Sequence, residues 1–347
     1  MKIVNITGVG NSGKGAAVDL LRGYTEIWAP KSNFEFDFFR VNGGMIDFLE
    51  VLKKDKSQMR IDLAFKKVRK NTLKMGLNPS ILNIYGNLIS TSQRYDKAFN
   101  NNFLKLTYEF LNELILYKTK AFWPYDRLET SIVENFLSKI SLRLGFENFS
   151  LSDVYYLNKE DLHRKFDDYL NKLISNLDKK KYKVYLLNNF FEPCHIKRFE
   201  NWISDLKSVV VVRDPRDIFL SGLSGKQIKN VKSNILPSEN DGIEKSFLGT
   251  NNIDFFIERF KSNISSINLN DSENQIVIKF EDLIFNLDKT KEKILDFLDG
   301  DLGNFIESPN QFDPKKSQNN TFLWEKENSY SNEIKVIENK LSQYLYH

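Results

Sequence analysis

The hydrophobic positions of this chain follow two patterns: short continuous apolar runs, and longer stretches in which apolar residues recur every three or four positions. Short runs rich in Val, Ile and Leu are typical of strands buried on both faces of a sheet. They occur near residues 2–7, 183–188, 208–212 and 275–280, and a shorter run, 26–29, is closed by Pro30. The longer pattern predicts helices over 162–177, 196–205, 253–267 and 287–298. The alternation predicts an α/β fold in which helices cover both faces of a parallel sheet.

The stretch from about residue 43 to residue 158 lacks this alternation and is expected to be mostly helical. Two sets of apolar residues at helical spacing are interpreted as core faces. They are Phe103, Leu106, Phe110, Leu111 and Leu114, and then Val133, Phe136, Leu137 and Ile140. We expect one domain over residues 1–347 with a helical insertion at about 43–158. Insertions of this size often cover the site of an α/β protein, so this one is expected to take part in substrate recognition.

Three further segments carry weaker signals. Acidic and aromatic residues alternate in 33–40, which favours a half-buried strand, although one of these acids is also a candidate general base. The polar stretch 230–252 is expected to form a mobile surface loop, and the last forty residues a loop followed by a closing helix.

Composition narrows the class of protein. The net charge of +4 permits an anionic ligand, but no arginine-rich tract predicts a nucleic-acid partner. A single cysteine, Cys194, excludes an internal disulfide and suits a reducing compartment, and with three histidines it leaves little material for a zinc site. No apolar segment approaches the ~20 residues that span a bilayer, and the first run is too short for a signal peptide. A cytoplasmic protein without a membrane span is therefore expected.

The first candidate site follows the first predicted strand. From Gly8 the sequence has the pattern G-x-x-x-x-G-K, and an Ala/Leu-rich segment with helical spacing comes next. In a strand–loop–helix unit the loop N–H groups and the helix N-terminus point together at an anion, so the pattern predicts a phosphate-binding loop. The Ser or Thr that usually follows the lysine and binds Mg²⁺ is replaced by Gly15. The loop is thus suited to phosphate but lacks the usual metal ligand.

A second candidate site follows the predicted strand 208–212. Arg213 lies where this strand ends, which is the edge at which open α/β sheets bind their ligands. Pro215 and Asp217 are favourable at a helix N-terminus, and Ser221 lies about two turns further on. An arginine and a hydroxyl together suit a phosphate. The alternative is that Arg213 and Asp214 form a structural ion pair, and the sequence leaves both interpretations open.

With two phosphate-binding segments, the chain resembles the sulfotransferase family that uses 3'-phosphoadenosine 5'-phosphosulfate (PAPS). Residues 7–15 resemble the family's 5'-phosphosulfate loop, and residues 211–217 with Ser221 resemble its 3'-phosphate motif. Residues 192–195 are similar to its Thr-Pro-x-His segment, residues 278–283 to its Tyr-Glu-Asp-Leu block, and residues 317–324, more weakly, to its cofactor-covering loop. Residues 43–158 have no counterpart in this resemblance.

The resemblance implies a P-loop-like fold of sulfotransferase type and transfer of a sulfuryl group from PAPS to a hydroxyl of a carbohydrate or small molecule, with no metal. It assigns the cofactor to Gly10, Asn11, Ser12, Gly13, Lys14, Gly15, Ala16, Arg213 and Ser221. Lys14 would also stabilise charge on the leaving phosphate. Many members carry Lys or Arg at the position of Asn11, so the missing cation comes either from Lys14 or from Lys315 or Lys316.

Two residues are candidates for the general base. His195 matches the histidine of the Thr-Pro-x-His segment, and Glu35 matches a glutamate found after the second strand of some members. Glu35 is preferred, because an acid between aromatic residues is suited to accept the proton of a hydroxyl. Two other functions stay open: a P-loop kinase or other ATP-dependent enzyme, with Asp214 as the candidate metal ligand, and a non-catalytic nucleotide-binding protein of the same fold.

Overall fold

The computed structural model describes residues 1–30, 34–76, 95–128, 136–137, 139–140, 143, 151–200, 202–224, 247–300, 302–306 and 312–347. These residues form two compact units. The first comprises Met1–Phe36 and Tyr182–His347, and the second comprises Asp37–Lys181.

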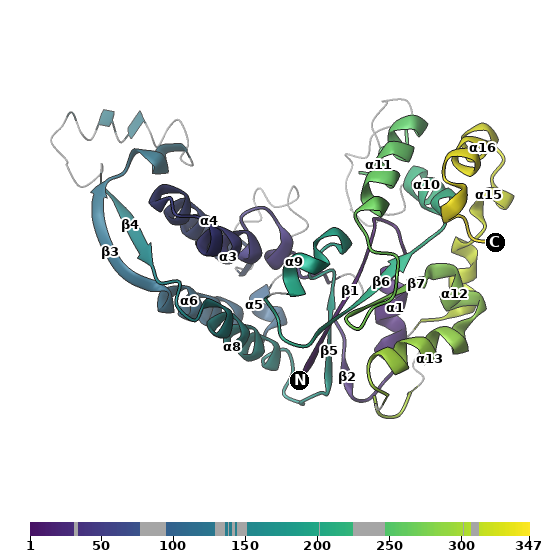
Figure 1. Cartoon of the computed structure of the whole chain (residues 1–347), viewed down its shortest axis with the longest axis horizontal. Coiled ribbons are helices and arrows are strands. Elements are labelled where there is room, and N and C mark those ends of the chain that lie inside the picture. Colours follow the sequence, from purple (N-terminus) through teal and green to yellow (C-terminus); the bar gives the residue numbers. More distant parts are fainter. Residues whose placement is uncertain are drawn as a thin grey trace. The chain divides into compact units, whose positions relative to one another are not determined.

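A five-stranded parallel sheet forms the centre of the first unit (Figure 1). Its strands, in spatial order, are β2 (Ile27–Trp28), β5 (Val184–Asn188), β1 (Lys2–Gly8), β6 (Leu206–Val212) and β7 (Gln275–Lys279). In the central register Ile6 lies between Asn188 and Val209. The predicted parallel sheet is confirmed. Because all strands run the same way, the segments that follow β1, β5 and β6 emerge at one edge of the sheet.

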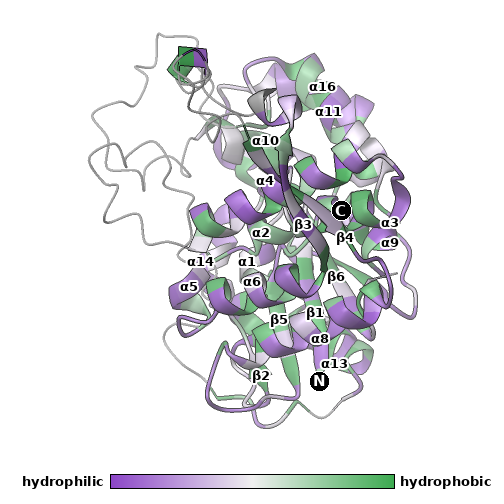
Figure 2. Cartoon of the chain, turned by 90° about the vertical axis from the view of Figure 1, so that its left-hand side faces the viewer, coloured by the Kyte–Doolittle hydropathy of each residue, from purple (hydrophilic) through white to green (hydrophobic). Residues whose placement is uncertain are grey.

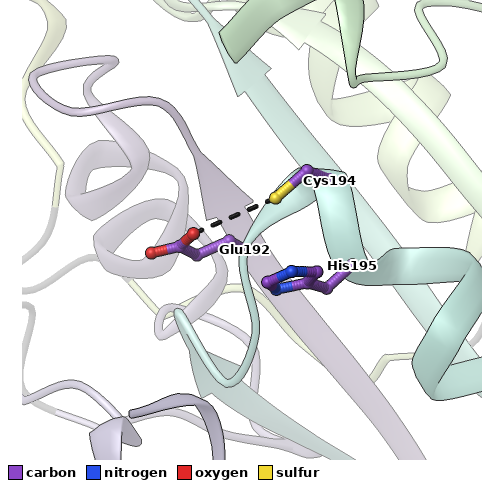
Figure 3. Close-up of side chains that lie close together, drawn as sticks. All are labelled: Glu192, Cys194 and His195. Carbon is purple, nitrogen blue, oxygen red and sulfur yellow. Dashed lines mark hydrogen bonds between the residues drawn. The ribbon is translucent and has the colours of Figure 1, made fainter. Parts of the chain in front are cut away.

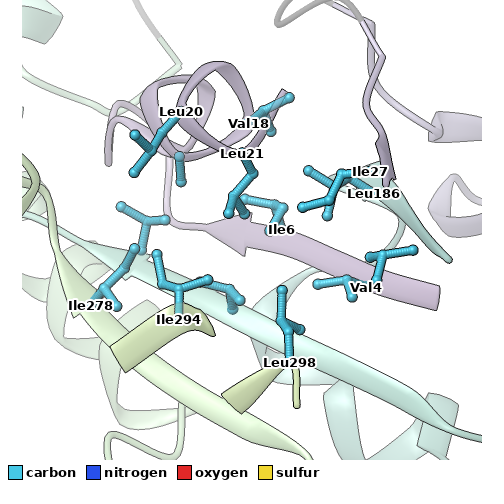
Figure 4. Close-up of a cluster of buried hydrophobic side chains, with 14 of the residues drawn as sticks. Val4, Ile6, Val18, Leu20, Leu21, Ile27, Leu186, Ile278, Ile294 and Leu298 are labelled. Carbon is cyan, nitrogen blue, oxygen red and sulfur yellow. The ribbon is translucent and has the colours of Figure 1, made fainter. Parts of the chain in front are cut away.

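One face of this sheet is covered by α1 (Lys14–Leu21), α12 (Phe280–Phe285) and α13 (Leu287–Phe297). Figure 4 shows Leu21 of α1 directed at Ile6 of β1, in a cluster that also contains Val18 of α1 and Ile294 of α13. The core residues Ile276 and Ile278 of β7 face α1 and α13, so Val277 between them faces the other side of the sheet. There Val277 lines a cavity together with Phe260 and Ile264 of α11 (Ile253–Ser265), which places α11 on this opposite face. Helices therefore lie on both faces, as predicted.

The remaining elements of the first unit are short. The helix predicted over 196–205 is a 3₁₀ turn, η5 (Pro193–His195), followed by α9 (Ile196–Glu200). The strand β6 leads directly into α10 (Pro215–Leu223). The predicted closing helix is α16 (Ser331–Lys340), preceded by α14 (Pro314–Ser317), η6 (Gln318–Asn320) and α15 (Leu323–Lys326), and followed by η7 (Ser342–Tyr344).

The second unit combines helices with a two-stranded antiparallel sheet. Its helices are α2 (Asp37–Arg40), α3 (Met45–Lys54), α4 (Gln58–Gly76), α5 (Tyr95–Ala98), α6 (Phe103–Glu113), η3 (Pro124–Leu128) and α8 (Leu162–Ser175). The amphipathic α8 shows both hydrophilic and hydrophobic residues in Figure 2, and its Tyr169 stacks on Phe110 of α6. The predicted core positions Phe103, Phe110, Leu111 and Leu114 are buried.

The stretch predicted to be mostly helical also contains two strands that were not predicted, β3 (Ile115–Phe122) and β4 (Leu151–Leu157), which pair with each other. Two other predictions are wrong. Phe136, Leu137 and Ile140 are exposed rather than core residues, and Val133 lies outside the described residues. The predicted half-buried strand is absent from the described residues 34–40: 34–36 have no regular structure and 37–40 form α2. Phe38 and Phe39, which would lie on opposite faces of a strand, are both buried.

Two further expectations from the sequence concern the surface loop 230–252 and the absence of a membrane span. Residues 230–246 of the predicted surface loop lie outside the described residues. At the end of that loop Asn252 caps α11, its side chain accepting a hydrogen bond from the N–H of Phe255. Among the residues that the structure describes, no helix has both the length and the apolar content needed to cross a membrane.

Buried charged residues tie the C-terminal segment to α10. Asp217 is fully buried, and its carboxylate accepts the N–H groups of Phe322 (3.1 Å) and Leu323 (2.8 Å). Arg216 forms an ion pair with Asp214 (2.8 Å) and lies over the ring of Trp324 at 3.7 Å. These contacts hold residues 321–324 against the start of α10. The position of the preceding residues 312–320 is thereby restricted as well.

Burial perturbs two of the carboxylates beneath α10. It raises the pKa of Asp217 to about 6, although Arg213 acts in the opposite direction. It raises the pKa of Glu281 to about 7, although one oxygen of Glu281 accepts the N–H of Asp214. The other oxygen of Glu281 is buried and has no hydrogen-bond partner in the described part of the chain. The ionised form of Glu281 is therefore costly in this position.

Substitution of Leu186 by Ala tests the central packing. Leu186 is completely buried on β5 in the cluster of Figure 4, and its loss should lower the free energy of unfolding by about 2–5 kcal/mol through lost apolar burial and a cavity. Urea unfolding measures the change. The control Ile306→Ala, at a side chain that is 58% exposed, should change the value by less than about 0.5 kcal/mol. Equal losses in both variants would contradict the assigned core.

Substitution of Glu281 by Gln tests the buried carboxylate. A pKa raised from 4.5 to about 7 means that the favourable contribution is present below pH 4.5 and is lost as the pH rises through 7. Gln cannot ionise, so Glu281→Gln should stabilise the protein at pH 8 by about 1–3 kcal/mol and leave its stability at pH 4, where the glutamate is largely protonated in both states, nearly unchanged. Urea midpoints at the two pH values measure this. The exposed control Glu292→Gln should show no such difference, and destabilisation of Glu281→Gln at pH 8 would refute the assignment.

Candidate functional site

The loop between β1 and α1 depends on two glycines. A Cβ atom on Gly8 would lie 2.3 Å from Oγ of Ser12 and 2.4 Å from the carbonyl oxygen of Val211. Gly13 has a φ of +83°, and a Cβ there would lie 2.2 Å from the ring of Phe280. Side chains at these positions would displace the loop from β6 and α12. The conformation of this loop therefore requires glycine at positions 8 and 13.

The N-terminus of α1 is available to an anion. Its N-cap residue is Gly13, which offers no side chain to its N–H groups, and its first turn holds no acidic residue. The hydroxyl of Ser12 is buried and has no hydrogen-bond partner among the described residues. The first N–H groups of an α-helix have no intrahelical partner and carry partial positive charge, so this end of α1 is suited to a phosphate.

Arg213 holds the glycine loop and the C-terminal segment together. Its side chain is buried, with 8% exposed, at the end of β6. One Nη atom donates to the carbonyl oxygen of Asn11 (2.9 Å) and the other to that of Asn320. Burial lowers the pKa of Arg213, and the neighbouring carboxylates, first Asp217, oppose this. Asp214 forms its ion pair with Arg216. The structural ion pair between Arg213 and Asp214, which the sequence left open as an alternative, is therefore not formed.

A cavity of about 460 Å³ joins the two predicted phosphate-binding segments. Predicted cofactor residues that line it are Asn11, Gly13, Gly15, Ala16, Arg213, Ser221 and Lys316. Its wall is completed by Phe280 and by the C-terminal residues Phe312, Asp313, Ser317 and Asn320, with Asp19 of α1. Gly10, Ser12 and Lys14 belong to the same loop without lining the cavity, and Lys315 is not part of its wall. The volume falls within the range of small-molecule sites.

Lys14 and Glu35 form an ion pair. Nζ of Lys14 lies 3.3 Å from Oε1 of Glu35, and both side chains are about one-quarter exposed or less. Oε2 of Glu35 accepts a hydrogen bond of 2.9 Å from the side-chain amide of Asn189, which follows β5. The amide oxygen of Asn189 in turn accepts from the hydroxyl of Thr7 on β1. Glu35 is therefore anchored at the same sheet edge as the loop lysine.

His195 belongs to a different group of side chains. It lies in η5 beside Glu192 and Cys194 (Figure 3), and its ring stacks on that of Phe199. None of these residues lines the cavity that contains Arg213. Of the two candidate bases, Glu35 is the one in contact with the loop lysine.

Sequence reasoning missed the roles of Asp217 and Glu281. Asp217 was expected only to favour the N-terminus of α10, whereas it also binds the segment that follows the cavity wall. Glu281 lies in the block 278–283 and accepts the N–H of Asp214. Both roles depend on residues more than 60 positions away in the sequence, so no local signal could have revealed them.

Three solved structures are similar to this chain at low levels. The sulfotransferase domain from the curacin biosynthetic pathway has 11% identity and a TM-score of 0.40, over 99% of this chain and 98% of that chain. The sulfotransferase domain from the Synechococcus PCC 7002 olefin synthase has 10% identity and a TM-score of 0.37, over 93% and 87%. Sulfotransferase STF9 from Mycobacterium avium has 11% identity and a TM-score of 0.39, over 99% and 75%. No curated protein sequence matches the chain.

The assignment to a family comes from a sequence model instead. The model described as "Sulfotransferase domain" matches residues 126–342, which contain Arg213, Ser221 and Lys316 but not the N-terminal glycine loop. Since this match covers more than half of the 347 residues, the chain belongs to the sulfotransferase family and is a sulfotransferase enzyme.

Proposed function

We propose that this enzyme transfers a sulfuryl group from PAPS to a hydroxyl of a carbohydrate or small molecule. The observation that carries the proposal is the cavity into which the glycine loop, Arg213, Ser221 and Lys316 all open. PAPS bears phosphate groups at two separate places, and this cavity has two separate kinds of phosphate-binding group. One is a glycine loop with an uncapped helix N-terminus, and the other is an arginine with a hydroxyl.

The 5'-phosphate is assigned to the N–H groups of residues 11–15, and the 3'-phosphate to Arg213 and Ser221. Arg213 is already desolvated and oriented by the carbonyl oxygens of Asn11 and Asn320, so little ordering remains for a ligand to impose. Its Nε atom is buried without a hydrogen-bond partner in the described residues. A phosphate group would supply that partner and offset the cost of the buried cation.

Lys14 and Glu35 are assigned to the chemical step. In the proposed reaction the acceptor oxygen attacks sulfur, the bond from sulfur to the 5'-phosphate oxygen breaks, and the hydroxyl proton passes to Glu35. Lys14 stabilises the charge that develops on the leaving phosphate oxygen. The 3.3 Å ion pair is consistent with both roles, since it holds the base and the cation at one sheet edge. Neither Glu35 nor His195 lines the cavity, and Glu35 is favoured as the base because it contacts the loop lysine.

The contacts of Asp214 argue against the ATP-dependent alternative. A P-loop kinase needs an acidic residue after an apolar strand to hold Mg²⁺. Asp214 accepts the N–H of Arg216, forms an ion pair with the side chain of Arg216 and is fully buried. Gly15 also lacks the hydroxyl that binds the metal in such loops. PAPS chemistry places no such demand on either position.

The second unit, Asp37–Lys181, contains the predicted insertion and is proposed to recognise the acceptor. Its β3–β4 sheet exposes Leu116, Tyr117, Phe122 and Tyr156, and Tyr117 packs against Tyr156 at 5.9 Å. Exposed apolar groups concentrated on one short sheet are typical of a binding surface.

Substitution of Arg213 by Ala tests the assignment of the 3'-phosphate. Affinity for 3'-phosphoadenosine 5'-phosphate should fall about 10- to 100-fold, because charge-assisted hydrogen bonds to one phosphate are lost. Affinity for adenosine 5'-phosphate, which lacks that group, should fall by a clearly smaller factor, because only the support of the loop through the carbonyl oxygens of Asn11 and Asn320 is lost. Calorimetric titration measures both, with the exposed Arg164→Ala as control. Equal losses for both nucleotides would make Arg213 structural, through its bonds to the two carbonyl oxygens.

Hydrolysis of PAPS, in which water is the acceptor, tests Lys14 and Glu35 without knowledge of the natural acceptor. Lys14→Ala should lower kcat about 100-fold or more while changing nucleotide affinity less than tenfold, because it acts on charge developed in the transition state. Glu35→Gln should lower kcat about 100-fold or more through loss of the base, and His195→Ala should change it less than about threefold. A large loss in His195→Ala with none in Glu35→Gln would reverse the assignment of the base.

A further inference from the structure

Glu192, Cys194 and His195 bring three different metal-binding groups together outside the nucleotide cavity (Figure 3). Among the described residues they are the one cluster of at least three His, Cys, Asp and Glu side chains whose ligand atoms all lie within 4.8 Å of one another. The cluster contains the single cysteine of the chain and one of its three histidines. All three lie within the segment 192–195 that resembles the Thr-Pro-x-His block.

The backbone explains why the three side chains meet. Glu192 is extended, with φ −76° and ψ 153°, as is usual before a proline, and Pro193 begins the 3₁₀ turn η5. The N–H of His195 donates to the carbonyl oxygen of Glu192 at 2.9 Å, which closes the turn. Pro193 is buried, and the ring of His195 stacks on the buried Phe199 of α9. One tight turn, anchored on two buried residues, therefore presents all three donors.

The spacing of the donors suits a small divalent ion. Sγ of Cys194 lies 3.9 Å from Oε2 of Glu192. In a tetrahedral zinc site, with a metal–sulfur distance of about 2.3 Å and a metal–oxygen distance of about 2.0 Å, the two ligand atoms lie about 3.5 Å apart. A small rotation of exposed side chains bridges this difference. Thiolate and imidazole donors favour zinc and similar transition metals over Mg²⁺ or Ca²⁺, which prefer oxygen ligands.

We propose that Glu192, Cys194 and His195 bind one Zn²⁺ ion, with the fourth position open to water. On binding, a sulfur–metal bond forms and the thiol proton of Cys194 passes to solvent. The site is separate from the residues assigned to PAPS, so it does not depend on the proposed function. It also gives His195 a role as ligand rather than as general base, in agreement with its position outside the cavity.

Cobalt titration of the untagged, reduced full-length protein tests this site. Co²⁺ substitutes for Zn²⁺, and a cobalt–thiolate charge-transfer absorption can arise only from Cys194, since the chain has one cysteine. We expect this absorption to saturate at one Co²⁺ per chain and to disappear when Zn²⁺ is added. Zn²⁺ should also slow alkylation of Cys194 by iodoacetamide. Absence of the absorption in the wild-type protein would overturn the proposal.

Variants separate a three-ligand site from a lone thiol. Cys194→Ser should abolish the absorption, and Glu192→Gln and His195→Ala should each weaken Co²⁺ binding at least about 10- to 100-fold. The control His163→Ala, which removes a histidine of the second unit that contacts Lys53, should bind Co²⁺ like the wild type. If Glu192→Gln and His195→Ala also bind like the wild type, while their circular dichroism shows them folded, the proposed site is wrong.

Discussion

The bonds from Arg213 to the carbonyl oxygens of Asn11 and Asn320 are the contacts on which the arrangement of the site depends. They join three segments that are far apart in the sequence: the glycine loop after β1, the end of β6, and the C-terminal segment. Without this buried guanidinium the two carbonyl groups would lose these hydrogen-bond partners. Arg213 thus holds in place two segments of the cavity wall, the one at Asn11 and the one at Asn320.

The negative charges near Arg213 must be balanced if an anionic ligand is to bind there. Asp214, Asp217 and Glu281 lie beneath the start of α10, where three full negative charges would repel a phosphate. Arg216 neutralises Asp214, and burial raises the pKa of Asp217 and Glu281 toward neutrality. Asp217, with a pKa of about 6, is still mostly ionised at neutral pH, and its charge is balanced by Arg213 and by the N–H groups of residues 322 and 323.

The sheet and the cofactor loops were predictable because their signals are local. Short Val- and Ile-rich runs specify buried parallel strands, and a glycine loop followed by a lysine specifies a phosphate site at a strand end. The β3–β4 sheet was missed because its strands expose much of their surface and lack a clear alternation. The segment after residue 33 was misassigned because its phenylalanines meet partners that only the tertiary structure supplies, such as Phe190 for Phe36 and Tyr95 for Phe38.

The other features of the site depend on contacts between residues far apart in the sequence and could not be predicted from it. Nothing in the local sequence links Glu35 to Lys14, or Arg213 to residue 320, although each residue could be named as a candidate by itself. The same holds for Glu192, Cys194 and His195, where a short spacing becomes a cluster only because Pro193 and the 3₁₀ turn bring the donor atoms to one side.

The central claim is that one cavity accepts a nucleotide with phosphates at both its 3' and 5' positions. Calorimetric titration of the wild-type protein with 3'-phosphoadenosine 5'-phosphate and with ATP, each with and without Mg²⁺, tests it most directly. The account predicts tight binding of 3'-phosphoadenosine 5'-phosphate that is independent of Mg²⁺, and much weaker binding of ATP. Mg²⁺-dependent binding of ATP, with no binding of the 3'-phosphorylated nucleotide, would contradict it.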